Sequence, residues 1–251
     1  MKRDRRSKLK KKRRKRILKL FMLILIGIII YLFIFKTDIF NIKRIEVIGN
    51  KNLKKDQVIK ASLCNIGENI FNISKKNGEA SLKRLSYIKE ANIKRKLPDK
   101  IVIEIVERKE IAIIPYIGSY IYIDDEGYVL KIEEQNDEVD LLRIDGIKLE
   151  NPIEGDNLFH TLADEEMVVF FNYSNSLNLI SLMKRVDFAD KTNVVIELKN
   201  GVKVAFGLLD NVKYKLRFLN KIINDIEEKG INARHILFNK GDNPIVVTDD
   251  R

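Results

Sequence analysis

The chain has 251 residues and a formal net charge of +11, with 47 Lys and Arg against 36 Asp and Glu. Residues 1–19 hold thirteen of the basic residues and one acid, so the rest of the chain is close to neutral. Because the positive charge is confined to one end, the bulk of the chain has no basic surface of the kind that binds nucleic acid. The single cysteine, Cys64, excludes a disulfide within the chain.

Residues 17–36 are predicted to form a transmembrane helix. An uncharged run begins at Leu20, contains Gly27 and ends at Phe35, and Ile17 extends the apolar character backwards. From Ile17 to Phe35 a helix rises roughly 28 Å at ~1.5 Å per residue, close to the ~30 Å of bilayer hydrocarbon. A buried core helix or a cleaved signal peptide would be alternatives. No small-residue cleavage motif follows, which favours an uncleaved signal anchor.

The flanking charges predict the orientation of this helix. Residues 1–16 form a basic tail with twelve Lys and Arg and one acid. Basic residues beside a span remain on the cytoplasmic side. The N-terminus is therefore expected in the cytoplasm, and the bulk of the chain outside the plasma membrane.

The pattern of residues 40–110 predicts a small α+β domain. Alternating apolar and charged residues indicate strands, and apolar residues three and four apart indicate helices. The Pro98-Asp99 pair is typical of a turn. In chain order we expect a strand at 40–48, a helix at 53–63, a helix capped by Ser74 and containing Gly78, and a hairpin of strands at 88–95 and 101–106.

Residues 111–248 predict a second, β-rich domain with flanking helices. Asn200-Gly201 is a strong hairpin signal, and Gly230 is expected to end the last helix. In chain order we expect a hairpin at 122–130, a helix at 162–173 capped by Thr161, strands at 181–188, 194–198 and 202–206, a helix capped by Asp210, and strands at 233–239 and 245–248.

These features resemble a known family. A β-α-α-β-β unit directly after a single span resembles a POTRA domain. Residues 95–99 (RKLPD) and 103–108 (IEIVER) resemble the signature of the bacterial cell-division protein FtsQ, called DivIB in Gram-positive bacteria. The proline that usually follows that Glu-Arg pair is missing here. Residues 122–130 (YIDDEGYVL) and 141–146 (LLRIDG) are similar to later motifs of the family, so the resemblance covers the layout of the whole chain.

The resemblance implies a function as well as a fold. It implies a bitopic scaffold of the divisome at the division septum, which binds FtsB/DivIC-type and FtsL-type partners outside the membrane and links them to septal peptidoglycan synthesis. Because the sequence contains no recognisable catalytic motif or metal-ligand set, we also expect no enzymatic activity and no cofactor. A membrane-anchored cell-wall enzyme and another POTRA-containing adaptor remain alternatives.

Candidate catalytic and metal-binding residues are few. His160 and His235 are far apart in the sequence and fit no metal-binding spacing. Cys64 has no obvious histidine partner and is expected to pack in a core. Residues 124–126 (DDE) could suggest a cation site, but three contiguous acids before a glycine are more typical of a solvated turn. We therefore predict no catalytic, cofactor or metal site.

The last strand is the predicted partner-binding site. It is β-branched throughout, which suits a strand, and no later strand of the chain is expected to cover its second edge. Residues 249–251 (DDR) would guard that edge against indiscriminate pairing. The resemblance implies the same region, since family members bind their FtsB/DivIC-type partner by strand addition. The alternative is a strand that only closes the sheet. The predicted site comprises Lys240, Gly241, Ile245, Val246, Val247 and Thr248.

The predicted orientation can be tested by protease protection. In intact protoplasts, added protease should remove the chain after about residue 40 and leave the basic tail intact, because the membrane shields the cytoplasmic side. Antibodies against each part would report the products, and permeabilised protoplasts, in which both parts are cleaved, serve as the control. Full protection of the outer part in intact protoplasts would contradict the orientation.

Overall fold

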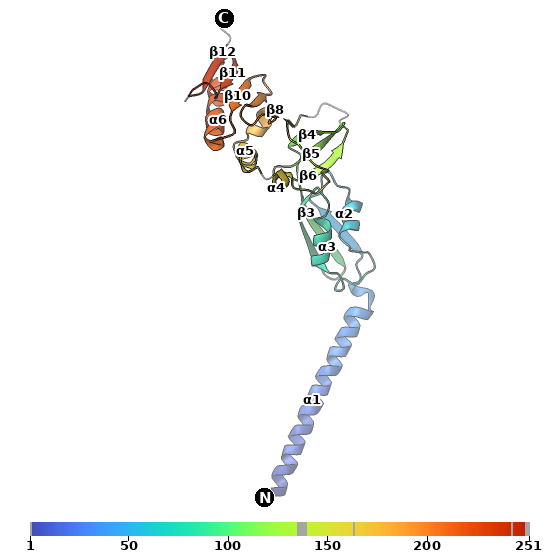
Figure 1. The fold of residues 1–251 in the computed structure, drawn as a ribbon. Helices are drawn as coiled ribbons and strands as arrows, with labels where there is room; N and C mark the ends of the chain where they lie inside the picture. Colours follow the sequence, from blue (N-terminus) through green and yellow to red (C-terminus); the bar gives the residue numbers. More distant parts are fainter. Residues whose placement is uncertain (1, 135–139, 163, 242, 249–251) are drawn as a thin grey trace. The chain divides into compact units, whose positions relative to one another are not determined.

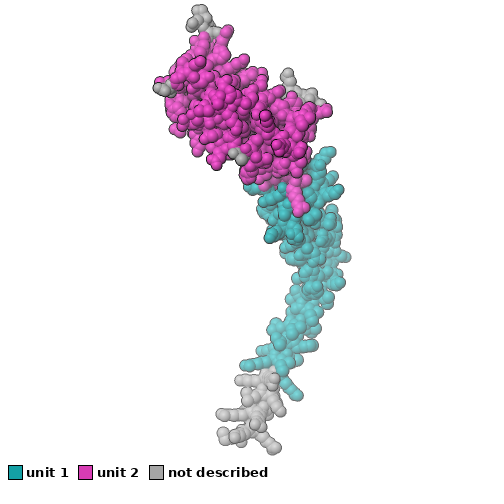
Figure 2. Space-filling view, in the orientation of Figure 1, with its two compact units in different colours: residues 1–83, 90–106 teal, residues 84–89, 107–251 magenta. Residues whose placement is uncertain are grey.

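The computed structural model describes residues 2–134, 140–162, 164–241 and 243–248, and the chain divides into two compact units (Figures 1 and 2). Unit 1 comprises residues 1–83 and 90–106, and unit 2 comprises residues 84–89 and 107–251. Both units mix helices with strands, which confirms the predicted α+β class.

Unit 1 begins with the helix α1, Lys2–Lys36. Its segment Arg14–Lys36 reaches a mean hydropathy of 2.9, and none of its most apolar window is buried. By length and composition this helix can cross a membrane. Ile17, Leu20 and Phe35 lie exposed along it, and no atom lies close to the position that a Cβ on Gly27 would take.

The remainder of unit 1 is a three-stranded sheet with two helices. The strand order is β1-β3-β2, and β1 runs parallel to β3. The order strand, helix, helix, strand, strand is the predicted one. The elements are η1 (Asp38–Phe40), β1 (Arg44–Ile48), α2 (Lys55–Ala61), α3 (Lys75–Leu82), β2 (Ile88–Lys96) and β3 (Lys100–Glu107).

Two helix features of unit 1 show how the sequence sets local structure. The Ser74 hydroxyl accepts a hydrogen bond from the amide of Asn77, which confirms Ser74 as the cap of α3. Gly78 lies inside α3, where a Cβ would come 2.4 Å from the carbonyl oxygen of Ser62. Glycine is needed there because α3 passes so close to the end of α2.

The first strand is shorter than predicted. Residues 38–40 form a 3₁₀ turn, and residues 40–42 hydrogen-bond with the α2–α3 loop instead of with the sheet: the amide of Ile42 donates to the Glu68 carbonyl at 2.9 Å, and that of Ile70 to the Phe40 carbonyl at 2.9 Å. Sheet pairing therefore begins at Arg44.

Unit 2 is built on a nine-stranded mixed sheet of order β12-β11-β10-β9-β8-β7-β4-β5-β6. The strands are β4 (Ala112–Tyr116), β5 (Ser119–Ile123), β6 (Val129–Glu133), β7 (Leu142–Asp145), β8 (Met183–Asp187), β9 (Val194–Leu198), β10 (Lys203–Gly207), β11 (Ala233–Leu237) and β12 (Ile245–Thr248). The helical segments are α4 (Leu158–Leu162), α5 (Glu165–Ser176), η2 (Leu179–Leu182) and α6 (Val212–Lys229).

The core of unit 2 lies between the sheet and the helices α5 and α6, which pack against each other. At its centre Phe170 meets the rings of Phe171, Phe188 and Phe206 edge-on, at centroid distances of 5.7, 5.4 and 5.6 Å. Such arrangements add to the free energy gained by burial. The predicted apolar stripe of α6 is buried and comprises Leu216, Leu219, Ile223 and Ile226.

Two predicted helix caps are wrong. The helix expected at 162–173 corresponds to α5, which begins at Glu165, and Asp164 caps it by accepting from the amide of Met167 at 3.1 Å. Thr161 belongs to the preceding helix α4, and its hydroxyl donates to the Asn157 carbonyl at 3.1 Å. Asp210 does not cap α6, since its carboxylate binds Lys215 at 2.5 Å and a left-handed Asn211 precedes the helix.

The remaining boundaries differ by a few residues. The strand predicted from residue 181 starts at Met183 because η2 occupies the preceding residues. The strand predicted to residue 239 ends at Leu237. The hairpin of β9 and β10 and the end of α6 at the left-handed Gly230 are as predicted.

Gly49 offers a test of how tightly unit 1 is packed. A Cβ there would lie 2.0 Å from the backbone oxygen of Ile105, whereas a Cβ at Gly67 meets nothing within 4 Å, and both glycines have positive φ. Gly67→Ala should therefore cost only about 1–2 kcal/mol of backbone strain, and Gly49→Ala about 1–3 kcal/mol more from the clash. Thermal unfolding of the full-length protein in detergent, followed by circular dichroism, should show the lower midpoint for Gly49→Ala. Equal midpoints would contradict the close approach.

Candidate partner interface

The strand β12 lies at one end of the unit 2 sheet. Among the strands that the structure describes, β12 pairs only with β11, antiparallel, with Ile245 opposite Leu237 and Val246 opposite Ile236. Its other row of backbone N–H and C=O groups therefore faces away from the sheet, which is the arrangement that can receive an additional strand.

The side chains of residues 245–247 in β12 alternate between the solvent and the core. Val246 is half-buried and packs against the core of unit 2. Ile245 and Val247 are 46% and 37% exposed, and Thr248 is exposed. An edge with apolar residues on its outer face offers contacts for a partner's side chains as well as main-chain hydrogen bonds.

The loop before β12 borders a hollow of about 500 Å³. Lys240 is exposed, and Gly241 has a φ of 106° with open space around it. The predicted site residues Lys240, Gly241 and Ile245 to Thr248 thus lie along one loop and one edge. The hollow's lining includes Phe206, Tyr214, Lys215, Phe238, Gly241 and Pro244. The predicted edge-guarding charges, Asp249, Asp250 and Arg251, lie outside the described residues.

The acids at 124–126 form hydrogen bonds and ion pairs with other residues of the chain. Asp124 is fully buried in the turn between β5 and β6, and its Oδ1 accepts from the amides of Glu126 at 3.0 Å and Tyr128 at 2.8 Å. Its Oδ2 accepts from Nη1 of Arg108 at 2.5 Å. The first acid is therefore part of a buried ion pair instead of the solvated turn or the cation site considered from the sequence.

Arg108 is the centre of this cluster. Its Nη1 also reaches Glu126 at 2.7 Å, its guanidinium lies 3.7 Å from the centre of the Tyr128 ring, and its side chain is only 9% exposed. Lys89 binds the second oxygen of Glu126 at 3.0 Å. Arg108 and Asp124 belong to two separate sequence motifs, and nothing in either motif indicates that the two side chains form an ion pair.

The hydrogen bonds from Arg108 and Lys89 lower the pKa of Glu126 below its ordinary value of 4.5. A carboxylate whose pKa is lowered by folding stabilises the folded state above its unfolded pKa, and this contribution is lost as the pH falls through the lowered value. The cluster is therefore a stabilising device that weakens in acid.

The other candidate residues do not converge. His160 is exposed on α4, and His235 is exposed on β11, opposite Val247. Cys64 is buried as expected, and burial raises the pKa of its thiol. Within the described ranges, no group of three or more His, Cys, Asp and Glu side chains could hold a metal ion.

Comparisons with known proteins point to one family. Residues 40–108 match the family described as "POTRA domain, FtsQ-type". The chain is 34% identical over 208 residues to the cell division protein DivIB of Clostridium tetani, covering 83% of this chain and 72% of that protein. It is 30% identical to DivIB of Clostridium acetobutylicum, covering 78% and 79%. The solved extracytoplasmic domain of DivIB from Geobacillus stearothermophilus aligns with 16% identity and a TM-score of 0.33, covering 49% of this chain and 96% of that one.

Arg108→Met tests the buried ion pair. It should lower the free energy of unfolding by about 3–5 kcal/mol, because Asp124 would be left buried without its partner. Lys94→Met is the matched control: it breaks the exposed pair of Lys94 and Glu104 and should cost about 0–1 kcal/mol. Urea denaturation of the full-length protein in detergent measures both. Similar losses in the two variants would contradict the role given to Arg108.

Proposed function

The chain belongs to the DivIB/FtsQ family of bacterial cell division proteins, and from this we propose that it is a bitopic scaffold of the divisome. The scaffold would hold FtsB/DivIC-type and FtsL-type partners outside the membrane and link them to septal peptidoglycan synthesis. Family membership supports a division protein with protein partners, and the finer assignment is argued from the site.

One observation carries the assignment of the partner site: β12 is an edge strand with an apolar outer face. A partner segment in extended conformation can add itself to such an edge, taking affinity from main-chain hydrogen bonds and selectivity from side-chain contacts. Ile245 and Val247, both partly exposed, would contact the partner on the outer face. The hollow beside Gly241 could receive a partner side chain next to the added strand.

We assign this edge to the FtsB/DivIC-type partner, as the family resemblance suggests. For the FtsL-type partner and the septal peptidoglycan synthase, the proposal rests on the resemblance alone. The function proposed is one of binding, without catalysis. This proposal is supported by the acidic turn at residues 124–126, which was the candidate cation site. Two of its carboxylates, Asp124 and Glu126, form ion pairs with Arg108.

The proposed topology follows from the charge bias around α1. A basic tail of residues 1–16 would lie in the cytoplasm, residues 17–36 would span the plasma membrane, and the domains at 40–110 and 111–248 would lie outside it, at the division septum. In the folded chain, residues 84–89 group with the second unit. The resemblance to division proteins supports the septal location.

Proline substitutions in β12 test the partner site. Consecutive residues of a strand direct their N–H groups to opposite sides, so of Val246→Pro and Val247→Pro one deletes an outward N–H and the other a bond to β11. The variant that deletes the outward N–H should fold normally but bind the outer domain of the DivIC-type partner about tenfold more weakly. The lost hydrogen bond accounts for ~0.5–1.5 kcal/mol of this loss, and the bulk of the proline ring adds to it. The variant that deletes the hydrogen bond to β11 should lower the midpoint of thermal unfolding.

Val247→Ile is the matched control, since it retains the N–H and a β-branched, apolar side chain and should bind nearly like the parent. Binding is measured with the purified full-length protein in detergent. If both proline variants remain folded and bind the partner like the parent, the site lies elsewhere, and the sheet edge of the first domain becomes the candidate.

A further inference from the structure

The end of α1 is capped by a residue far along the chain. The last four carbonyls of a helix have no partner within the helix. Here the Thr37 hydroxyl donates to the Phe33 carbonyl at 2.6 Å, and Nδ2 of Asn69 donates to the Ile34 carbonyl at 2.8 Å. Asn69 is 8% exposed. The loop between α2 and α3 therefore supplies part of the cap of the apolar helix.

Aromatic rings make a second connection at the same place. The Phe71 ring lies 6.4 Å from the ring of Phe35 and 5.4 Å from that of Phe40, centre to centre. Phe33 and Phe40 are 6.1 Å apart in the same way. Phe33 and Phe35 belong to the uncharged run of α1. The rings of Phe40 and Phe71, which contact them, therefore extend the apolar surface of α1 into the domain.

Backbone hydrogen bonds fix the loop to the chain that leaves the helix. The amide of Gly67 donates to the Ile42 carbonyl at 2.8 Å, in addition to the bonds of Ile42 and Ile70 described above. Asn41 and Asn69 form an antiparallel bridge. The α2–α3 loop is thus held against α1 by main-chain bonds, a side-chain cap and ring contacts.

These contacts set the depth of the loop in a membrane. Ile34 is two residues before Lys36, the first charge after the uncharged run, and two residues correspond to about 3 Å along the helix axis. If α1 spans the bilayer, Ile34 and Phe35 lie at the boundary between hydrocarbon and headgroups. Asn69 and Phe71 contact them directly and must lie at the same depth.

We propose that residues 68–72 of the α2–α3 loop form a lipid-contacting element that seats the first domain on the outer surface of the bilayer. Phe71 would lie against the acyl chains beside Phe35, and the amide of Asn69 would satisfy the helix end in place of water. Ile39, 45% exposed and three residues past the span, adds apolar surface at this level. The occupant is lipid because this surface is continuous with the span itself.

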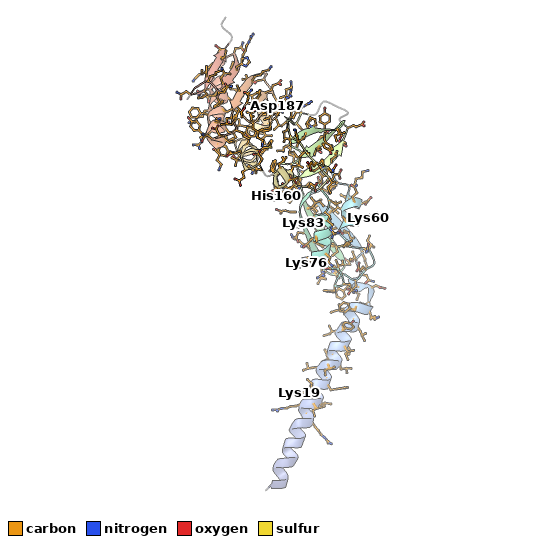
Figure 3. All side chains as sticks on the ribbon, viewed as in Figure 1. Lys19, Lys60, Lys76, Lys83, His160 and Asp187 are labelled. Carbon is orange, nitrogen blue, oxygen red and sulfur yellow. The ribbon has the colours of Figure 1, made fainter. Side chains whose placement is uncertain are left out.

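The charges nearby suit phospholipid headgroups. Lys36 ends α1, and Lys75 and Lys76 open α3 shortly after Phe71. Figure 3 shows Lys76 near the end of the domain from which α1 leaves, whereas Lys83 lies farther from α1. Lysine ammonium groups at headgroup level can bind phosphate while their stems cover apolar surface.

Lipid quenching of a fluorophore tests this contact without disturbing it. Full-length protein with Cys64→Ala would carry one cysteine label, at the exposed Asn72 (N72C) or at the exposed Lys83 (K83C), in vesicles of phosphatidylglycerol and phosphatidylcholine. Lipids with a nitroxide near the headgroup should quench the label at position 72 several-fold more strongly than that at position 83. Equal quenching at the two positions would overturn the proposal.

Two further variants test whether the named contacts hold the loop in place. Asn69→Ala and Phe71→Ser, combined in the N72C protein, should reduce the quenching severalfold, while the same changes in the K83C protein leave its weak quenching unchanged. Circular dichroism would verify that the domain remains folded. Undiminished quenching in a folded double variant would show that these contacts do not seat the loop and would overturn the proposal. The outcome is independent of partner binding at β12.

Discussion

The buried ion pair of Arg108 and Asp124 holds together the first strands of the second unit. Asp124 is fully buried and Arg108 nearly so, and two such charges are tolerated only when each is well paired. The aspartate meets this condition with one guanidinium nitrogen and two backbone amides, and the arginine with two carboxylates and the Tyr128 ring. The turn between β5 and β6 is therefore fixed to the residue that follows β3.

The same region explains why residues 84–89 group with the second unit. The amide of Arg108 donates to the Tyr87 carbonyl at 2.8 Å, and the Ser86 hydroxyl donates to the Leu130 carbonyl at 2.6 Å. The Tyr87 hydroxyl donates to Glu110 at 2.5 Å, and burial, together with this bond, raises the pKa of Tyr87. Two segments distant in sequence are thus joined to the β5–β6 hairpin, so a domain boundary drawn at one residue does not describe the folded chain.

The two ends of the nine-stranded sheet have different chemistry. At the β6 end, Lys131 binds Glu133 at 2.6 Å and lies 4.1 Å from the centre of the Tyr122 ring, so charges occupy the outer strand. Charges on an edge discourage further pairing. At the β12 end, the exposed described residues of the strand are Ile245, Val247 and Thr248, none of which is charged. This contrast is a physical reason for placing the proposed partner at β12.

Features that depend only on neighbouring residues can be read from the sequence alone. The uncharged run from Leu20 to Phe35, the hairpin at Asn200-Gly201, the cap at Ser74 and the helix end at Gly230 all arise from local chemistry, and the structure has α1, the hairpin, the cap and the helix end at those places. The motif resemblance identified the family for the same reason, since its residues are close together in the chain.

Contacts between residues that are distant in sequence depend on the folded arrangement of the whole chain. Several polar side chains near a helix start are suited to cap it, and the fold decides which one does: Asp164 caps α5, whereas Thr161 lies in α4 and bonds the Asn157 carbonyl. The cap that Asn69 gives to Ile34 joins residues 35 apart, and Arg108 lies beside Asp124 because β4 and β5, which separate the two residues in sequence, pair with each other. The sequence predicted a last strand, but that β12 lies at the edge is a property of the assembled sheet.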